Sequence, residues 1–144
     1  RVVNNSRALS LELSKSLQYK ELQKEGINTP KTVFAKGKNQ LLKLGSNFPL
    51  PFLTKHNRAG KGLGIKLFKE YKSFEEYINI GDFDESVDGI TLIQEYIKPK
   101  GTRIIRTEFV NNEFLYAVQI DASKEDRWTF AMQFVCKSRE DIVF

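Results

Sequence analysis

A glycine-rich loop between two short apolar runs is the feature that most constrains how this chain folds. His56–Gly64 reads HNRAGKGLG, with three glycines in five residues, and it joins strand candidates at 49–55 and 65–68. Glycine lets the backbone approach an anion closely, because it has no side chain and adopts conformations that other residues avoid. The loop is therefore either a flexible clamp over phosphates or a solvated hairpin loop.

Two common phosphate-binding motifs do not fit this loop. In the P-loop pattern G-x-x-x-x-G-K-[ST], Gly60-Lys61 would be followed by serine or threonine, but Gly62 stands there. The dinucleotide pattern G-x-G-x-x-G would need a glycine where Ile65 stands. The loop also leads into a strand pattern and not into a helix, so neither architecture is expected.

Before residue 98 the pattern mixes helices with short strands. Good helix formers fill residues 7–25 and Gly26 follows as a stop signal, so one long helix is expected there. Two shorter helices are expected over 39–44 and over 73–80, the second capped by Ser73. Apolar and β-branched residues predict strands over the remaining segments: 31–35, 49–55, 65–68 and 90–97.

After residue 98 the pattern changes to a meander. The pair Asn111-Asn112 suits a type I′ turn, because asparagine tolerates positive φ. Strands are expected on both sides of this turn and once more near the end: 103–110, 113–121 and 128–136. We therefore expect an α+β chain with a leading helix (1–28), a first lobe ending in a hinge strand (29–97) and the start of a second lobe (98–144).

Composition excludes several classes of site. Cys136 and His56 are the only cysteine and histidine, so an intrachain disulfide, a thiolate-rich metal site and a two-histidine zinc site are excluded. Lysine and arginine total 23 against 18 acidic residues, and the net charge of +5 suits ATP as well as nucleic acid. No segment reaches the roughly 20 apolar residues of a membrane span and no export signal opens the chain, so a cytoplasmic location is expected. Both ends interrupt a pattern, which predicts a fragment of a longer protein.

Two lysines are candidates for holding an anion. Lys55 ends a strand pattern just before the glycine loop, so it either projects into a cleft or is an exposed strand-end lysine. Apolar neighbours surround Lys15 on one face of the expected helix: Leu11, Tyr19 and Leu22. Lys15 either points into a site or extends its ammonium group past these neighbours to solvent.

The segment Gln94–Ile97 and the 103–121 hairpin are two further candidates. Gln94–Ile97 (QEYI) closes a strand at the change of pattern, so its backbone groups either bind the edge of a heterocycle or continue an ordinary strand. A two-residue turn would give the hairpin one apolar and one polar face. The apolar face would hold Ile105, Phe109, Phe114, Tyr116, Val118 and Ile120. The polar face, either solvated or the floor of a cleft, would hold Arg106, Glu108, Gln119 and Asp121.

Taken in order, these features resemble the ATP-grasp superfamily. The resemblance rests on a helix with an embedded lysine, a strand ending in lysine, a glycine loop, a hinge tetrad and a hairpin bearing an arginine. It spans about residues 5–121, and the run FLTKHNRAGKGLG at 52–64 is similar to the lysine strand and lid loop of the family. Within the superfamily the chain looks most like the carboxylate–amine ligases that resemble the enzyme adding glutamate to a ribosomal protein.

The resemblance implies a role for each candidate residue. The phosphates of ATP would be contacted by Lys15, Lys55, Gly60, Lys61, Gly62 and Gly64. Adenine would be framed by Gln94, Glu95, Tyr96 and Ile97, and Arg106 would be a catalytic residue of the active-site sheet. In the implied reaction a carboxylate substrate, not identified by the sequence, forms an acyl phosphate from which an amine or thiol displaces phosphate.

The chain also departs from the family pattern. No Glu-x-Asn follows Asp121, so Mg²⁺ is expected in the full-length protein with ligands outside this chain, and the fragment alone is expected to be inactive. Two alternatives remain open: a non-catalytic nucleotide-binding module and a basic nucleic-acid-binding domain. The second would need aromatic residues exposed beside lysine or arginine. Because the expected apolar face places its aromatic residues among aliphatic ones, no nucleic-acid partner is expected, and the lack of a long apolar segment predicts no membrane partner.

Overall fold

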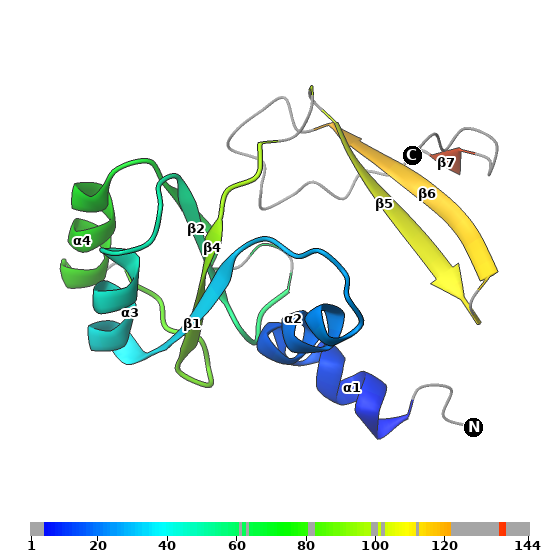
Figure 1. The fold of residues 1–144 in the computed structure, drawn as a ribbon, viewed down its shortest axis with the longest axis horizontal. Coiled ribbons are helices and arrows are strands. Elements are labelled where there is room, and N and C mark those ends of the chain that lie inside the picture. The colour runs from blue at the N-terminus through cyan, green and yellow to red at the C-terminus, as the bar shows by residue number, and fades with distance from the viewer. Residues whose placement is uncertain are drawn as a thin grey trace. The chain divides into compact units, whose positions relative to one another are not determined.

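The computed structural model of this chain divides into two compact units, the first ending at Ile97 and the second starting at Lys98 (Figure 1). The residues that it describes are 5–60, 62, 64–80, 83–98, 101, 103–111, 113–121 and 136–137. Helices combine with antiparallel sheets, so the chain is α+β as expected. Within the described residues, no helix has both the length and the apolar character needed to cross a membrane.

The leading segment forms two helices, so the expectation of one long helix is wrong. Helix α1 (Ser6–Glu12) ends before Ser14, and helix α2 (Lys15–Lys24) begins directly after it. Ser14 has an extended backbone (φ −144°, ψ 108°), and its hydroxyl accepts a hydrogen bond from the Leu17 N–H. A serine in this position favours a new helix start over continuation, because it satisfies an N–H that has no partner within the helix.

The expected stop at Gly26 is confirmed. Gly26 follows the last residues of α2 with a φ of +72°, and the Ile27 N–H donates to the Leu22 carbonyl at 2.9 Å. A residue in this left-handed conformation ends a helix, and glycine adopts it without the clash that a side chain would cause. The chain then turns toward the first strand.

The first unit is built on a four-stranded antiparallel sheet. The strands are β1 (Thr32–Lys36), β2 (Phe52–His56), β3 (Lys66–Phe68) and β4 (Ile90–Glu95), in the order β1-β4-β2-β3. Helices α3 (Gly37–Gly45) and α4 (Tyr71–Asn79) lie together beside this sheet (Figure 1). Helix α4 begins after Glu70, so Ser73 is not its cap; the Ser73 hydroxyl donates to the Glu70 carbonyl from within the first turn.

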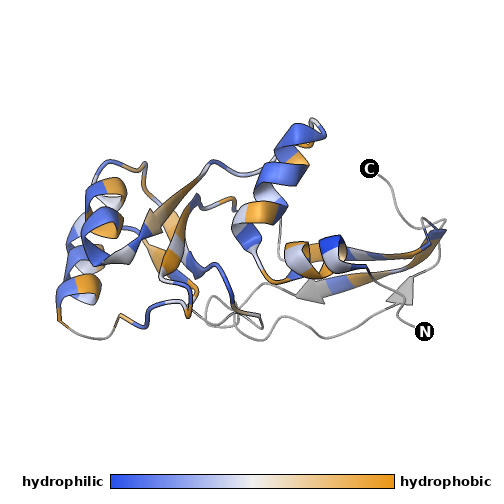
Figure 2. Cartoon of the chain, turned by 90° about the horizontal axis from the view of Figure 1, so that it is seen from below, coloured by the Kyte–Doolittle hydropathy of each residue, from blue (hydrophilic) through white to orange (hydrophobic). Residues whose placement is uncertain are grey.

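An aromatic core fills the space between the sheet and these two helices. The rings of Phe52, Phe68 and Phe74 have centroids 5.2–5.6 Å apart. The other buried members of this core are Ala35, Leu41, Phe48, Ile78 and Ile93. Figure 2 shows hydrophobic residues concentrated along the strands, whereas α3 and α4 carry both hydrophobic and hydrophilic residues. The sheet is thus fixed by packing on the face that bears Phe52 and Ile93.

The substitution Thr54→Val is expected to stabilise the fold. It is 1% exposed, and its hydroxyl has no hydrogen-bond partner among the described residues. Valine replaces this unsatisfied buried hydroxyl with a methyl group of similar size, which should raise the free energy of unfolding by about 1 kcal/mol. Urea denaturation of Thr54→Val would measure the gain. The matched control is Thr32→Val, which should destabilise, because the Thr32 hydroxyl donates to the Pro30 carbonyl and accepts from Gln94, both at 2.8 Å.

The second unit is an antiparallel sheet of β5 (Arg103–Val110), β6 (Glu113–Asp121) and β7 (Cys136–Lys137), in the order β5-β6-β7. Strands β5 and β6 have the expected bounds, and Asn111 in the turn has the positive φ of +49° that the turn type requires. Most of the third strand expected at 128–136 lies outside the described residues.

The expected faces of this hairpin are wrong, because the register shifts between Glu108 and Phe109. Phe109 pairs with Phe114, but Glu108 pairs with Tyr116, so Leu115 is an extra residue with no partner opposite it. Side chains alternate between the two faces, so one extra residue exchanges the faces of all later pairs. Arg106 therefore lies opposite Val118, on the face expected to be apolar. Two side chains expected in the core are exposed instead: Ile105 (60%) and Phe109 (61%).

Candidate functional site

Lys55 lies on β2, half-buried, with its side chain fixed by the neighbouring strand. Its Nζ donates to Gln94 Oε1 at 2.6 Å, and Gln94 Nε2 donates in turn to the Thr32 hydroxyl at 2.8 Å. In register, Lys55 lies opposite Leu92. Burial lowers the pKa of Lys55, and the nearby positive charge of Lys15 lowers it further. An ammonium group held in these surroundings is poorly hydrated and favours an anionic partner.

Lys15 reaches the same region from the start of α2. Its Nζ donates to the carbonyl of Ala59 in the glycine loop, and its backbone N–H donates to the Asn57 carbonyl at 3.3 Å. Burial lowers the pKa of Lys15 as well. The expected helical face with Leu11 is wrong, because Leu11 belongs to α1 and the chain breaks at Ser14. The side chain of Lys15 points to the loop.

The two lysines and the glycine loop together form the candidate site. Like charges close to one another disfavour the charged form of both groups, and an anion between them removes this penalty. Phosphate groups suit such a site, because charge-assisted hydrogen bonds to their oxygens are about twice as strong as bonds between neutral groups. The arrangement has the positive charge and the hydrogen-bond donors that suit a polyphosphate.

The glycine loop begins one residue later than expected. His56 is the last residue of β2 and is 6% exposed, and its Nε2 lies 2.6 Å from the Asp84 carbonyl oxygen. At the other end of the loop Gly64 packs against the His56 ring with a φ of +70°. Gly62 also has a positive φ, of +80°, and its carbonyl accepts from the Ile65 N–H at 3.2 Å. Lys61 and Leu63, which belong to the predicted loop, lie outside the described residues.

Gly64→Ala is expected to destabilise the protein more than Gly26→Ala does. Both glycines have a φ near +70°, but an added Cβ at Gly64 would overlap the His56 ring, whereas at Gly26 it would meet nothing within 4 Å. The ring is held by its contact with Asp84, so we expect an additional loss of about 1–2 kcal/mol from overpacking. Thermal unfolding of both variants would measure the difference. Equal losses would show that Gly64 is needed only for its backbone conformation.

In the hinge tetrad, which is Gln94–Ile97, some backbone N–H groups already have hydrogen-bond partners. The Glu95 N–H donates to the Lys31 carbonyl at 2.9 Å, and the Tyr96 N–H donates to the Pro51 carbonyl at 3.1 Å. Within the described part of the chain the Ile97 N–H has no hydrogen-bond partner, and the residue is 59% exposed. Gln94 acts through its side chain, which contacts Lys55. The donor that the tetrad can offer to a heterocycle is thus the Ile97 N–H.

Arg106 lies on β5 in the second unit. Its Nε is 2.8 Å from Glu108 Oε1, and the two side chains are 31% and 38% exposed. An ion pair of this exposure contributes about 0–1 kcal/mol to stability. The structure thus contains the ion pair that would account for Arg106 without catalysis, and a catalytic role stays a prediction.

Sequence reasoning missed Asn57, the first residue after β2. It is 3% exposed, and its side chain bonds to residues of α2 and to Asp88. Asn57 carries no charge, and its partners lie more than 30 residues away in the sequence. The available signal was its position two residues after Lys55, directly after the strand that carries this lysine.

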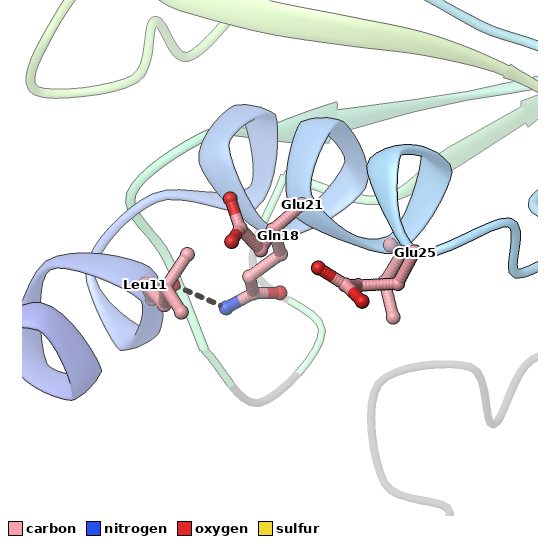
Figure 3. A pocket seen from close by; sticks show the side chains of 5 residues that line it. Leu11, Gln18, Glu21 and Glu25 are labelled. Carbon is pink, nitrogen blue, oxygen red and sulfur yellow. Dashed lines mark hydrogen bonds between the residues drawn. The ribbon is translucent and has the colours of Figure 1, made fainter.

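A separate pocket lies beside α1 and α2 (Figure 3). It has a volume of about 270 Å³ and is lined by Leu11, Gln18, Glu21, Leu22 and Glu25. The Gln18 amide donates to the Leu11 carbonyl at 2.7 Å at one side of it. Its charged groups are carboxylates, so it does not suit phosphate. Among the described residues, no group of three or more His, Cys, Asp or Glu side chains could hold a metal ion.

Comparison with known families identifies the fold. The profile of the RimK-like ATP-grasp domain matches residues 13–129, which is most of the chain. The chain belongs to the RimK-like ATP-grasp family. The match includes both lysines, the glycine loop, the hinge tetrad and Arg106, and it confirms the resemblance found in the sequence. A search of curated protein sequences finds no match.

Solved structures of this fold are similar to the chain. D-alanine–D-alanine ligase from Helicobacter pylori has a TM-score of 0.62 at 24% identity, over 93% of this chain and 38% of its own. An ATP-grasp RimK domain protein from Sphaerobacter thermophilus has a TM-score of 0.54 at 15% identity, over 67% of this chain and 36% of its own. The ADP complex of N5-carboxyaminoimidazole ribonucleotide synthetase has a TM-score of 0.57 at 13% identity, over 79% of this chain and 33% of its own. The RimK-like chain thus spans 33–38% of the length of these structures.

Proposed function

We propose that this chain is the ATP-binding portion of an ATP-dependent carboxylate–amine or carboxylate–thiol ligase. The observation that supports the proposal most is the placing of two lysines at the glycine loop, in a chain of the RimK-like ATP-grasp family: Lys15 donates to the Ala59 carbonyl of the loop, and Lys55 lies on the strand that leads into it. Among the structural neighbours, one is D-alanine–D-alanine ligase and another is a complex with ADP. The two lysines would receive the phosphates of the nucleotide, and glycines 60, 62 and 64 with Lys61 would close over them.

The backbone of the hinge tetrad would bind the edge of the adenine ring. The Ile97 N–H is the donor left over in the described part of the chain, and neighbouring carbonyl oxygens can accept a hydrogen bond from an exocyclic amine. Adenine offers a ring acceptor beside an amine donor, whereas guanine has a carbonyl oxygen in place of the amine. The same backbone groups would therefore favour ATP over GTP.

Bound ATP supplies the phosphoryl group that activates a carboxylate. In the proposed reaction a carboxylate oxygen attacks the γ-phosphorus and ADP leaves, which forms an acyl phosphate. The amine or thiol then attacks the acyl carbon, and phosphate leaves. We propose that Arg106 holds the γ-phosphate or the acyl phosphate, because its planar guanidinium can donate two parallel hydrogen bonds. Mg²⁺ would be held by residues of the full-length protein outside this chain.

Calorimetric titration of the full-length protein with ATP, GTP and inorganic tripolyphosphate tests the proposal. We expect measurable binding of tripolyphosphate and tighter binding of ATP than of GTP. Equal affinity for both nucleotides would contradict the adenine role of the hinge, and no binding of any of the three would overturn the proposed function. ATP binding without phosphate release in the presence of carboxylate and amine substrates would favour a non-catalytic module.

A further inference from the structure

Asn57 uses all of its polar groups in contacts that join three separate segments. Its backbone N–H donates to the Ile90 carbonyl at 3.1 Å, which extends the pairing of β2 with β4. Its Oδ1 accepts from the Ser16 N–H at 2.8 Å, and its Nδ2 donates to Asp88 Oδ2 at 2.6 Å. A side chain that is 3% exposed and bonded at both ends has one fixed orientation.

The bond to Ser16 reaches the first turn of α2. The first N–H groups of a helix have no partner within the helix, and here one of them is satisfied from a strand end 41 residues away. The backbone carbonyl of Asn57 also accepts from the Lys15 N–H at 3.3 Å. These two bonds hold the start of α2 at two adjacent residues, and Lys15 is the first residue of the helix.

The bond to Asp88 anchors the opposite end of the amide. Asp88 Oδ1 accepts from the Ser86 hydroxyl at 2.9 Å and from the Ile90 N–H at 3.1 Å, so its carboxylate is fixed at the entry to β4. Burial alone would raise the pKa of Asp88, but hydrogen bonds from Asn57, Ser86 and the Ile90 N–H outweigh it and lower the pKa. Asp88 is therefore a charged acceptor, and bonds to charged groups are stronger than neutral ones.

We propose that Asn57 is a positioning residue, which bridges Asp88 to the N-terminus of α2 and thereby holds Lys15 close to Lys55 on β2. The proposal rests on the proposed role of these lysines in binding phosphate. Lys15 Nζ donates to the Ala59 carbonyl in the loop that follows β2, and Lys55 lies on β2, so bonds that hold the start of α2 at Asn57 keep both lysines beside the same loop. Asn57 supplies these bonds, and it lies two residues from Lys55 on the same strand path.

The chemistry at this position requires an amide. The group facing Ser16 must accept a hydrogen bond from an N–H, and the group facing Asp88 must donate one to a carboxylate. Aspartate would place two carboxylates against each other, and leucine would leave the carboxylate and the N–H without partners. Among side chains of this length, asparagine alone offers an acceptor and a donor side by side.

The test measures the pKa of Lys55. A pH titration monitored by NMR gives this pKa in the full-length protein labelled with ¹³C at the lysine side chains. Lys15 lowers this pKa, so Lys15→Ala marks the largest rise that removal of its charge can cause. Asn57→Ala should raise the pKa of Lys55 in the same direction but by less, because the side-chain bond to Ser16 is lost whereas the backbone bond to Lys15 stays. The matched control is Asn5→Ala, which removes the N-terminal cap of α1, a bond from the Ala8 N–H at 2.9 Å, and leaves the bridge intact. It should leave the pKa of Lys55 unchanged.

Binding of tripolyphosphate and ATP gives the second measurement. Asn57→Ala should weaken both about tenfold, since misplacing a binding group costs affinity even where the group itself is retained. Wild-type pKa and affinity in folded Asn57→Ala would overturn the positioning role and leave the proposed function standing. If the wild-type protein binds neither ligand, the proposed function fails, and the pKa comparison still decides whether Asn57 holds Lys15.

Should Asn57→Ala fail to fold, Asp88→Ala breaks the bridge at its far end. It leaves α2 untouched and removes the acceptor that orients the Asn57 amide. The pKa of Lys55 should again rise and tripolyphosphate should bind more weakly. An Asp88→Ala protein that is folded and has the wild-type pKa of Lys55 would contradict the proposal.

Discussion

Phe74→Ala is expected to lower the free energy of unfolding by about 3–5 kcal/mol, the usual range for a phenylalanine in a core. Phe74 is fully buried, and its ring packs edge-on against Phe52 and Phe68 with centroids 5.2 Å away. Its removal would leave a cavity among three segments, and relaxation of the surrounding side chains would fill it only in part. The free energy of unfolding of a typical domain is roughly 5–15 kcal/mol, so a loss of this size is a large share of it. Urea denaturation would measure it.

Gly45 provides the matched test of this packing. A Cβ added there would overlap the Phe74 ring, so Gly45→Ala alone should destabilise the wild-type protein by about 1–3 kcal/mol. In the Phe74→Ala background the overlap disappears, and the added methyl group should be neutral or favourable. The two changes are therefore expected to be strongly non-additive. Additive losses would show that the Gly45 helix end is strained for a reason other than contact with Phe74.

Lys55→Ala is expected to weaken ATP binding to the full-length protein by about 1–3 kcal/mol, the scale of hydrogen bonds to charged groups. Its ammonium group is poorly hydrated in the free protein, so little hydration is lost when a phosphate binds. The loss should be the same for tripolyphosphate as for ATP, because the contact is to phosphate. Calorimetric titration with both ligands would measure it.

Lys43→Ala is the control for the loss of one positive charge. Lys43 is exposed on α3, and its removal should leave both affinities unchanged apart from a small salt-dependent effect. If Lys55→Ala and Lys43→Ala bind ATP equally well, Lys55 does not contact the phosphates. A loss with Lys55→Ala for ATP that is absent for tripolyphosphate would place Lys55 at another part of the nucleotide.

Features decided by neighbouring residues were predicted from the sequence, and features decided by distant ones were not. Gly26 ends α2 as predicted, because the left-handed conformation is a local preference of glycine. The bounds of β5 and β6 follow from alternation and from the Asn111-Asn112 turn. The break at Ser14 was missed, since a serine within good helix formers becomes a cap only when other contacts stabilise the new helix start.

The candidate site divides in the same way. The position of Lys55 on a strand face follows from alternation, and the glycine loop follows from composition. The direction of Lys15 depends on Ala59 and Asn57, which lie more than 40 residues away. The face of Arg106 depends on the extra residue Leu115, and no residue type in the hairpin indicates this irregularity. The expected alternation from a two-residue turn was therefore wrong beyond Phe109.

The closeness of Lys15 and Lys55 also ties the stability of the protein to its ligand. A lysine whose folded pKa lies below the ordinary 10.5 binds fewer protons when folded than when unfolded, between its lowered value and 10.5. The free energy of unfolding therefore rises with pH across this window, and below it the repulsion between the two charges acts against the folded state. A polyanion that binds between them reverses this effect, and by mass action it favours folding more as its concentration rises. Bound nucleotide would therefore raise the free energy of unfolding most at the pH values where both lysines are charged.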